Sequence, residues 1–222
     1  MYLLYSASQY RKLPVKSVGE YYVGCRKMKA PERIQTERLV LRRYRVTDAT
    51  DIFKSYAQDI EVTKFLSWRP HQSIEESKSF VKDRIDAWSQ GNDFTWAVTL
   101  NDTRLIGGIG LRIRDFKADF GCVIGRPYWD NGYATEALRA IVQWALQQPQ
   151  VFRVWAVCDI ENTASARVME KCALIKEGVL RRWIMHPQVS DTPRDCLCYS
   201  ITREMNSQQS GAADTLPRAA DL

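Results

Sequence analysis

The chain has 222 residues, of which 45% are hydrophobic and 26% are charged, enough for one domain with a buried core. Its net charge of +6 comes from scattered arginines and lysines without a basic run, which argues against nucleic-acid binding and is compatible with a small anionic ligand. The six cysteines include no CxxC pair and only two histidines occur, so the sequence predicts no metal site and reduced, mostly buried thiols.

The two ends of the chain differ in character from its middle. Residues 1–30 lack clear periodicity, and we interpret them as an N-terminal extension of which residues 1–27 need not be native. Residues 207–222 are small and polar and are expected to form a disordered tail. No apolar run approaches the ~20 residues that span a membrane, and the first residues are too polar for a signal peptide. We therefore expect a cytoplasmic protein, with no membrane partner, whose folded domain covers residues 31–206.

The first half of the domain begins with a strand and two helices. Leu39 and Leu41 indicate the strand. Thr47 is the natural N-cap of the first helix, which runs through Tyr56. The second helix begins near Ser73 and is ended by the letters "QGND". Three consecutive strands follow, the first two joined by the turn "NDTR" into a hairpin: residues 94–100, 105–113 and 118–125.

The second half alternates helices and strands. A long amphipathic helix starts after Gly132, and its apolar stripe includes Ala134, Leu138 and Ile141. The remaining elements are a strand, a helix and two more strands, at residues 152–158, 163–172, 177–185 and 196–202. The order β-α-α-β-β-β-α-β-α-β-β predicts an α/β domain, mixed α+β in type, with one mixed sheet flanked by helices.

The start of the helix after Gly132 is unusual. Apart from Thr135, its first turn has no side chain that obviously caps the backbone N–H groups. A glycine lets the backbone turn tightly and lets a ligand approach closely. A glycine turn before an uncapped helix suits a phosphate group, but a plain turn hydrated by water is an equal alternative from this stretch alone.

Three segments occur in a characteristic order, "WDNGYATEAL", "VCDIENTASARVMEKC" and "KEGVLRR", together with "TERLVLRRY", "WRPHQSIEES" and "CLCYSI". On these segments residues 34–204 resemble the GNAT superfamily of N-acetyltransferases, in particular its RimJ/RimL type. The resemblance implies the GNAT fold, with a central, mostly antiparallel sheet of six to seven strands. The sheet would be splayed in its middle and flanked by about four helices.

The resemblance also implies acetyl-CoA as co-substrate and no metal. The pyrophosphate would lie on the main-chain amides of Asp130, Asn131, Gly132, Tyr133, Ala134 and Thr135. The pantetheine arm would lie in the splay, along the main chain of Cys122, Val123 and Ile124. Asn162 matches the asparagine that bonds the pantetheine in the family, and Ser165 sits where the family places a hydroxyl near the sulfur.

Acetyl transfer from a thioester needs a donor for the developing oxyanion, a neutral amine and a proton for the leaving thiolate. We assign the Val123 amide as the oxyanion donor and Ser165 as the general acid, with an ordinary helix-start serine as the alternative for Ser165. Many relatives carry a tyrosine one turn further on, where this chain has Met169. The general base is not assigned, because Glu136 and Glu177 both fit structural roles and water is an alternative proton acceptor.

The acceptor site is expected beside the two N-terminal helices, with Trp68, His71 and Trp96 lining it. The first hypothesis is direct attack, in a ternary complex, by the N-terminal amine of a protein such as a ribosomal protein. A small amine, such as an antibiotic or polyamine, is the alternative and would favour an acidic pocket. A third alternative is a GNAT-fold protein that binds acetyl-CoA and only regulates. We expect a monomer or homodimer. The carboxylates available to an acidic pocket are Asp59, Glu61, Glu75 and Glu76.

Overall fold

The structure is a computed structural model that describes residues 28–206. Residues 1–27 of the predicted extension and the predicted tail, residues 207–222, lie outside the described residues. Met28 and Ala30 are buried against the core, and the Met28 amide donates to the Gly91 carbonyl at 3.0 Å. The packed part of the described chain therefore includes residues 28–30.

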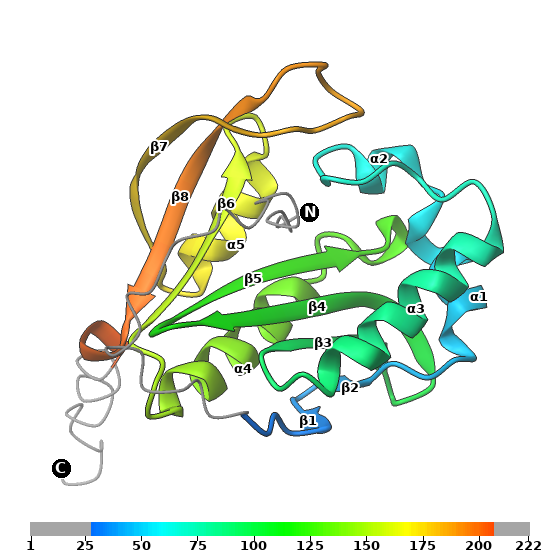
Figure 1. The fold of residues 1–222 in the computed structure, drawn as a ribbon, viewed down its shortest axis with the longest axis horizontal. Coiled ribbons are helices and arrows are strands. Elements are labelled where there is room, and N and C mark those ends of the chain that lie inside the picture. The colour runs from blue at the N-terminus through cyan, green and yellow to red at the C-terminus, as the bar shows by residue number, and fades with distance from the viewer. Residues whose placement is uncertain (1–27, 207–222) are drawn as a thin grey trace, which may run out of the picture.

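One eight-stranded sheet, in the order β1-β2-β3-β4-β5-β6-β8-β7, forms the centre of the molecule (Figure 1). All neighbours are antiparallel except β5 and β6, which confirms the predicted mixed, mostly antiparallel sheet. The strand beyond the expected six to seven is β1, which is too short to show a periodic pattern. The strands are β1 Arg33–Gln35, β2 Leu39–Arg43, β3 Asp93–Leu100, β4 Arg104–Arg114, β5 Lys117–Ile124, β6 Arg153–Asp159, β7 Ile175–Ile184 and β8 Arg194–Thr202.

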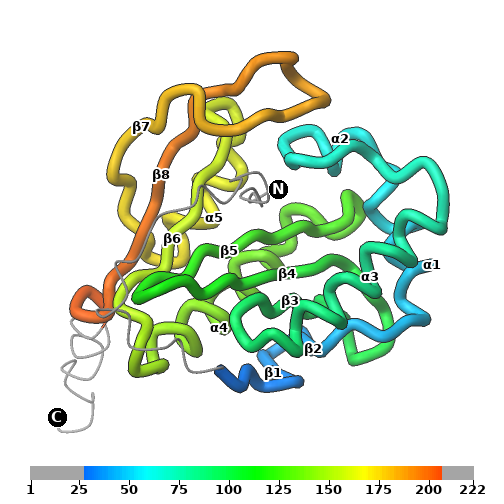
Figure 2. The backbone as a smooth tube through the Cα atoms, in the orientation of Figure 1, coloured from blue at the N-terminus to red at the C-terminus, as the bar shows by residue number. Residues whose placement is uncertain are grey.

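The sheet splits between β5 and β6. These two parallel strands pair only from Lys117 to Asp119 on β5, opposite residues 153–155 on β6. Beyond that point the two strands diverge, as Figure 2 shows, and β5 continues to Ile124 beside β4 alone. The predicted splay of the sheet is therefore present.

Helices cover both faces of the sheet. One face carries α1, the π-helical turn that follows it and α3, which pack with Ala97 and Leu105 in one apolar cluster. The other face carries α4 and α5, which pack on the larger core. The helical elements are α1 Asp48–Ile52, the π turn Phe53–Ala57, α2 Ile60–Thr63, α3 Ile74–Trp88, a 3-10 turn Arg126–Tyr128, α4 Tyr133–Gln147 and α5 Thr163–Lys171. None of the helices within residues 28–206 is long and apolar enough to cross a membrane.

Thr47 occupies the N-cap position of α1, as predicted, but its side chain does not cap the helix. It has helical backbone angles and its side chain makes no capping hydrogen bond. The start of α1 is organised by the buried Asp48 carboxylate instead, which accepts two hydrogen bonds from Arg42 at 2.8 Å and one from the Arg45 amide at 2.7 Å. The short helix α2, which the sequence analysis missed, is capped by Asp59 through the amides of Glu61 and Val62.

Candidate active site

The turn before α4 leaves the first amides of the helix without a capping side chain. Gly132 has a φ of +77°, in the left-handed region that favours glycine, and no side chain caps the helix. The first helical hydrogen bond joins the Glu136 amide to the Gly132 carbonyl at 3.0 Å. The N–H groups of Tyr133, Ala134 and Thr135 precede that bond at the positive end of the helix dipole. These groups can hold an anion.

Side chains around the turn hold it in this shape. The Trp129 indole N–H donates to the Ile124 carbonyl at 2.7 Å. Arg38 donates from Nη1 to the Asn131 carbonyl at 2.9 Å and from Nε to Glu136 at 2.7 Å. Burial acts to raise the pKa of Glu136, but hydrogen bonds from Thr36 and Arg38 lower it below its usual value. Glu136 therefore supports the turn and is not available as a base.

A cavity of about 380 Å³ lies at this helix start, and we call it the cofactor cavity. Three basic side chains line it beside the amides, Lys64, Arg167 and Lys171, and three carboxylates line it as well, Glu61, Asp130 and Glu161. Its size and the amides at the helix start suit a phosphate-bearing ligand such as acetyl-CoA. The predicted residues that line it are Ile124, Asp130, Gly132, Tyr133, Ala134, Thr135 and Asn162, whereas Asn131, Cys122 and Val123 do not.

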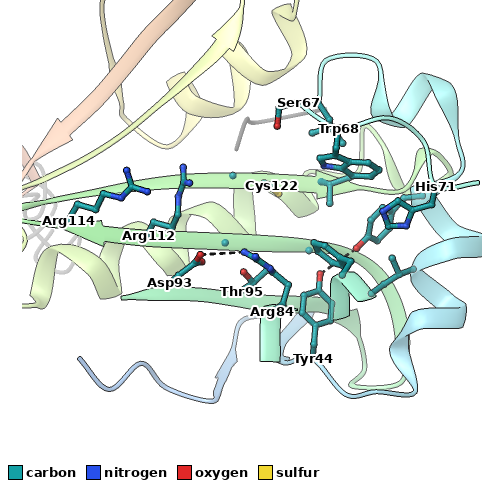
Figure 3. A pocket seen from close by; sticks show the side chains of 18 residues that line it. Tyr44, Ser67, Trp68, His71, Arg84, Asp93, Thr95, Arg112, Arg114 and Cys122 are labelled. Carbon is teal, nitrogen blue, oxygen red and sulfur yellow. Dashed lines mark hydrogen bonds and ion pairs between the residues drawn. The ribbon is translucent and has the colours of Figure 1, made fainter. Parts of the chain in front are cut away.

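A second cavity, of about 470 Å³, lies over the other face of β5, and we call it the acceptor cavity (Figure 3). Of the residues predicted for the acceptor, Trp68 and His71 line it, with their rings 5.0 Å apart. His71 Nδ1 lies 2.7 Å from Ser77 Oγ, and burial lowers the pKa of His71, so its imidazole is neutral at pH 7. Cys122 and Val123, predicted to contact the cofactor, line this cavity instead.

The prediction that Trp96 lines the acceptor site is wrong. Trp96 is fully buried, its ring contacts Trp144 of α4 at 5.9 Å, and its indole N–H donates to the Pro31 carbonyl. Side chains alternate along a strand, so the cavity receives Asp93 and Thr95 from β3 instead. Trp88, interpreted as a core residue, does pack in the core against Trp96.

Several residues of the acceptor cavity were not identified from the sequence. Arg84 comes from α3, and Arg112 and Arg114 come from β4. Arg112 and Arg114 could have been identified from the sequence, because residues 108, 110, 112 and 114 of one strand must share a face. Nothing in the sequence shows that Arg84 joins them.

The loop between β7 and β8 contacts the wall of the acceptor cavity. Gln188 donates from Nε2 to the carbonyls of Thr63 and Trp68, each at 2.6 Å. The buried His186 ring packs edge-on against Phe65 at 6.1 Å. This loop thus fixes the position of Trp68 from across the splayed sheet.

The hydrogen-bond parity of β5 decides which amide faces the splay. The Gly125 amide donates to the Ile106 carbonyl of β4 at 2.8 Å, and the register runs without a shift through Ile124 and Val123. Residue pairs in an antiparallel ladder alternate between hydrogen-bonded and non-hydrogen-bonded pairs. The main-chain groups of Val123 therefore point to Gly108 of β4, and those of Ile124 point away from β4. The Ile124 carbonyl indeed bonds Trp129 rather than β4. The register therefore favours the Ile124 amide over the Val123 amide as the oxyanion donor.

Asn162 and Ser165 lie at the start of α5. The Asn162 side chain caps the helix by accepting from the Ser165 amide at 3.2 Å, and Asn162 also lines the cofactor cavity. Ser165 is fully buried and lines neither of the two cavities. The role predicted for its hydroxyl stays a prediction.

Comparison with known proteins decides the family. Residues 38–174 match the profile of the Acetyltransferase (GNAT) domain. The uncharacterized N-acetyltransferase YoaA of Bacillus subtilis (strain 168) is 32% identical over 174 residues, which cover 77% of this chain and 96% of YoaA. The chain belongs to the GNAT acetyltransferase family. It is an acetyl-CoA-dependent N-acetyltransferase.

Solved structures agree with the fold of this acetyltransferase. A GNAT-family acetyltransferase from Bacillus anthracis is 27% identical and superposes with a TM-score of 0.68, over 78% of this chain and 99% of that one. RimL, described as the ribosomal L7/L12 alpha-N-protein acetyltransferase and solved with coenzyme A, shares the fold at 17% identity. Its TM-score is 0.70, over 78% of this chain and 99% of RimL.

Glu177 of the acetyltransferase lies away from both cavities. Its carboxylate is held by both terminal nitrogens of Arg153 and by Ser200 Oγ at 2.6 Å. The hydrogen bonds from Arg153 are the main cause that lowers the pKa of Glu177 to about 2. A carboxylate this acidic and this distant from the acceptor is a structural group.

Glu177→Gln should therefore leave kcat/KM within about twofold of the parent value. The pKa is lower in the folded chain than the ordinary 4.5, so the ion pair stabilises the fold above pH 4.5. Its contribution is lost as the pH falls from 4.5 to about 2. Urea unfolding should thus show a less stable variant at pH 7 and a shrinking difference towards pH 2. A large loss of kcat with unchanged stability would instead assign Glu177 to the reaction.

Proposed function

We propose that this enzyme transfers acetyl to a primary amine by direct attack in a ternary complex, with acetyl-CoA in the cofactor cavity and the amine in the acceptor cavity. One observation carries the proposal: Val123 and Ile124 are consecutive on β5, yet they line different cavities. Consecutive side chains of a strand point to opposite faces. The two cavities therefore approach each other at the end of β5, where β6 has diverged.

The chain supplies the contacts that acetyl-CoA requires. The amides of Tyr133, Ala134 and Thr135 would hold the pyrophosphate, with Lys171 and Arg167 nearby to balance its charge. Asn162 would bond the pantetheine arm along the open edge of β5. Acetyl-CoA supplies the acetyl group as a thioester. The Ile124 N–H would stabilise negative charge on the carbonyl oxygen.

Direct attack is supported by the state of the nearby thiol. Cys122 lines the acceptor cavity, but burial raises the pKa of Cys122 to about 12. The thiolate is the nucleophilic form, and it is scarce at neutral pH for such a group. An acetyl-cysteine intermediate is therefore disfavoured at this position.

We propose the N-terminal amine of a protein as the acceptor. RimL, a structural neighbour, is described as acting on the alpha amine of ribosomal L7/L12. A small polycation would need an acidic pocket, but none of the four carboxylates considered for it lines the acceptor cavity. Asp59 caps α2 and pairs with Arg126, and Glu61 lies at the cofactor cavity. Arginines occupy the acceptor cavity instead.

Thiol release tests this proposal. Acetyl-CoA would be incubated with the full chain and a panel of peptides with free or blocked N-termini, beside a panel of polyamines and aminoglycosides. We expect release of coenzyme A only with free-amine peptides. Turnover of small amines alone would contradict the acceptor, and acetyl-CoA binding without turnover of either panel would favour a regulatory protein.

Ser165→Ala tests the proposed general acid. The leaving thiol has a pKa near 8.5, so help from an acid is modest, and we expect kcat to fall about tenfold with the KM for acetyl-CoA unchanged. Ser200→Ala is the control, because Ser200 is also buried but bonds Glu177 and lines neither cavity. Equal kcat values for the two variants would leave Ser165 as a helix-start serine only.

A further inference from the structure

The floor of the acceptor cavity contains a channel lined by glycines. Strand pairing places residues of β3, β4 and β5 in rows across the sheet, and every second row faces the cavity. Three of the facing positions are glycines, and the Tyr44 hydroxyl covers one of them, Gly108, so the passage from the edge at Val123 to a charged row further along runs over Gly121 and Gly110. The rows, starting at that edge, are Ala97–Gly108–Val123, Thr95–Gly110–Gly121 and Asp93–Arg112–Asp119.

The channel has the length of a short extended peptide. Val123 and Asp119 are four residues apart on β5, which corresponds to about 13 Å at ~3.3 Å per strand residue. A fully extended peptide advances by a similar distance per residue. In an extended peptide whose amine lies at Val123, the fourth residue lies close to the charged row, and a long side chain such as glutamate lets the third residue reach it as well.

Positive charge predominates at that end of the channel (Figure 3). Arg112 donates from Nε to Asp119 at 3.0 Å, and Arg84 pairs with Asp93 at 3.3 Å. Arg114 is exposed, and within residues 28–206 its side chain forms no ion pair or hydrogen bond. Three arginines thus face two carboxylates, and Lys117 stands opposite Arg114 on the neighbouring strand.

The same channel contains buried polar atoms that lack partners in the described chain. They are Thr95 Oγ1, Asp93 Oδ1 and Arg84 Nε, and Thr95 is only 6% exposed. Buried polar groups are normally hydrogen-bonded. A ligand that satisfies these atoms must supply a donor to the carboxylate oxygen and an acceptor to the guanidinium N–H, and either kind of group can bind the hydroxyl. The main chain of an extended peptide supplies both kinds in alternation.

We propose that the acceptor is a peptide N-terminus that lies extended along this channel and carries an anionic group, a carboxylate or a phosphate, on its third or fourth residue. Arg112 and Arg114 bind that group, and the main chain of the peptide satisfies Thr95 and Asp93. The proposal rests on the proposed function and adds the recognition of sequence to it. It also predicts that polyamines bind this cavity poorly.

Peptides that each carry one glutamate, at a different residue in each peptide, test the proposal. Peptides of about eight residues would carry one glutamate at each position from the second to the seventh, each matched by a glutamine peptide. With the full chain and acetyl-CoA, kcat/KM should be highest with glutamate at the third or fourth residue, by about tenfold over glutamine. Phosphoserine at the best position distinguishes the two anions.

The outcomes separate this inference from the proposed function. Equal turnover of all peptides, or an optimum at any residue other than the third or fourth, overturns the anion site but leaves N-terminal acetylation intact. Failure of every peptide beside turnover of small amines overturns both. Preference for glutamine over glutamate at the third and fourth residues overturns the anion site directly.

Charge reversal at Arg114 gives the matched test. Arg114→Glu should invert the preference, so that a lysine at the third or fourth residue gives a higher kcat/KM than glutamate. Arg104→Glu is the control, because Arg104 is an exposed arginine of the same strand that does not line the cavity. Its glutamate-to-glutamine ratio should match the parent. If Arg114→Glu keeps the parental preference while its melting temperature is unchanged, Arg114 does not bind the anion.

Discussion

Replacing Gly132 with aspartate should raise the KM for acetyl-CoA by about 10- to 100-fold, equivalent to ~1.4 to 2.8 kcal/mol, while the protein stays folded. The left-handed φ of +77° at this position is tolerated by aspartate and asparagine better than by other side chains. An aspartate at the start of α4 would accept from the first amides and stabilise the helix. It would also place a negative charge where the account puts the pyrophosphate.

Gly132→Asn is the matched control, because it has nearly the same shape without the charge. Its KM should lie within a few-fold of the parent, and both variants should melt within a few degrees of it. Acetyl-CoA titration by calorimetry measures the affinity directly. Equal affinity of the aspartate and asparagine variants would show that no phosphate lies at the start of α4.

Gly107→Ala should lower the free energy of unfolding by about 2 to 3 kcal/mol and the melting temperature by roughly 5 to 10 °C. A Cβ at Gly107 would fall well under 3.0 Å from the Val123 carbonyl oxygen, which is backbone and cannot turn aside. It would also meet Ile124. The end of β5 must therefore move, so kcat should fall together with stability.

Gly178→Ala is the control for this substitution. Gly178 also lies in a strand, but a Cβ there meets nothing within 4 Å. Its unfolding free energy should stay within about 0.5 kcal/mol of the parent. Urea unfolding of the two variants checks both values. A Gly107→Ala variant as stable and active as the parent would mean that β4 and β5 are not packed this closely.

The order of elements and the turn at Gly132 could be predicted from the sequence because each depends on local pattern. The face on which Trp96 lies could not. Six consecutive residues of β3, from Phe94 to Thr99, are buried, so the strand shows no alternation of apolar and polar residues. Alternation reveals a face only when one side of the sheet meets water. The pattern therefore did not show that Thr95, and not Trp96, faces the acceptor cavity.

The oxyanion donor shows a second limit of sequence reasoning. Val123 and Ile124 are both apolar strand residues, and nothing in their identity says which amide bonds β4. Only the register, fixed by Gly125 and Ile106, resolves this one-residue choice. The arginine cluster has the same origin, because the pairing of β3 with β4 and the packing of α3 bring distant residues together.

The central claim is that the two substrates meet at the end of β5. A crystal structure with a conjugate that joins coenzyme A through an acetyl linker to a peptide N-terminus tests it most directly. The account predicts the pyrophosphate on the amides of residues 133–135, the linker carbonyl at the Ile124 N–H and the peptide on the glycine channel. A conjugate whose peptide leaves β5 on the same face as its pantetheine would contradict the account.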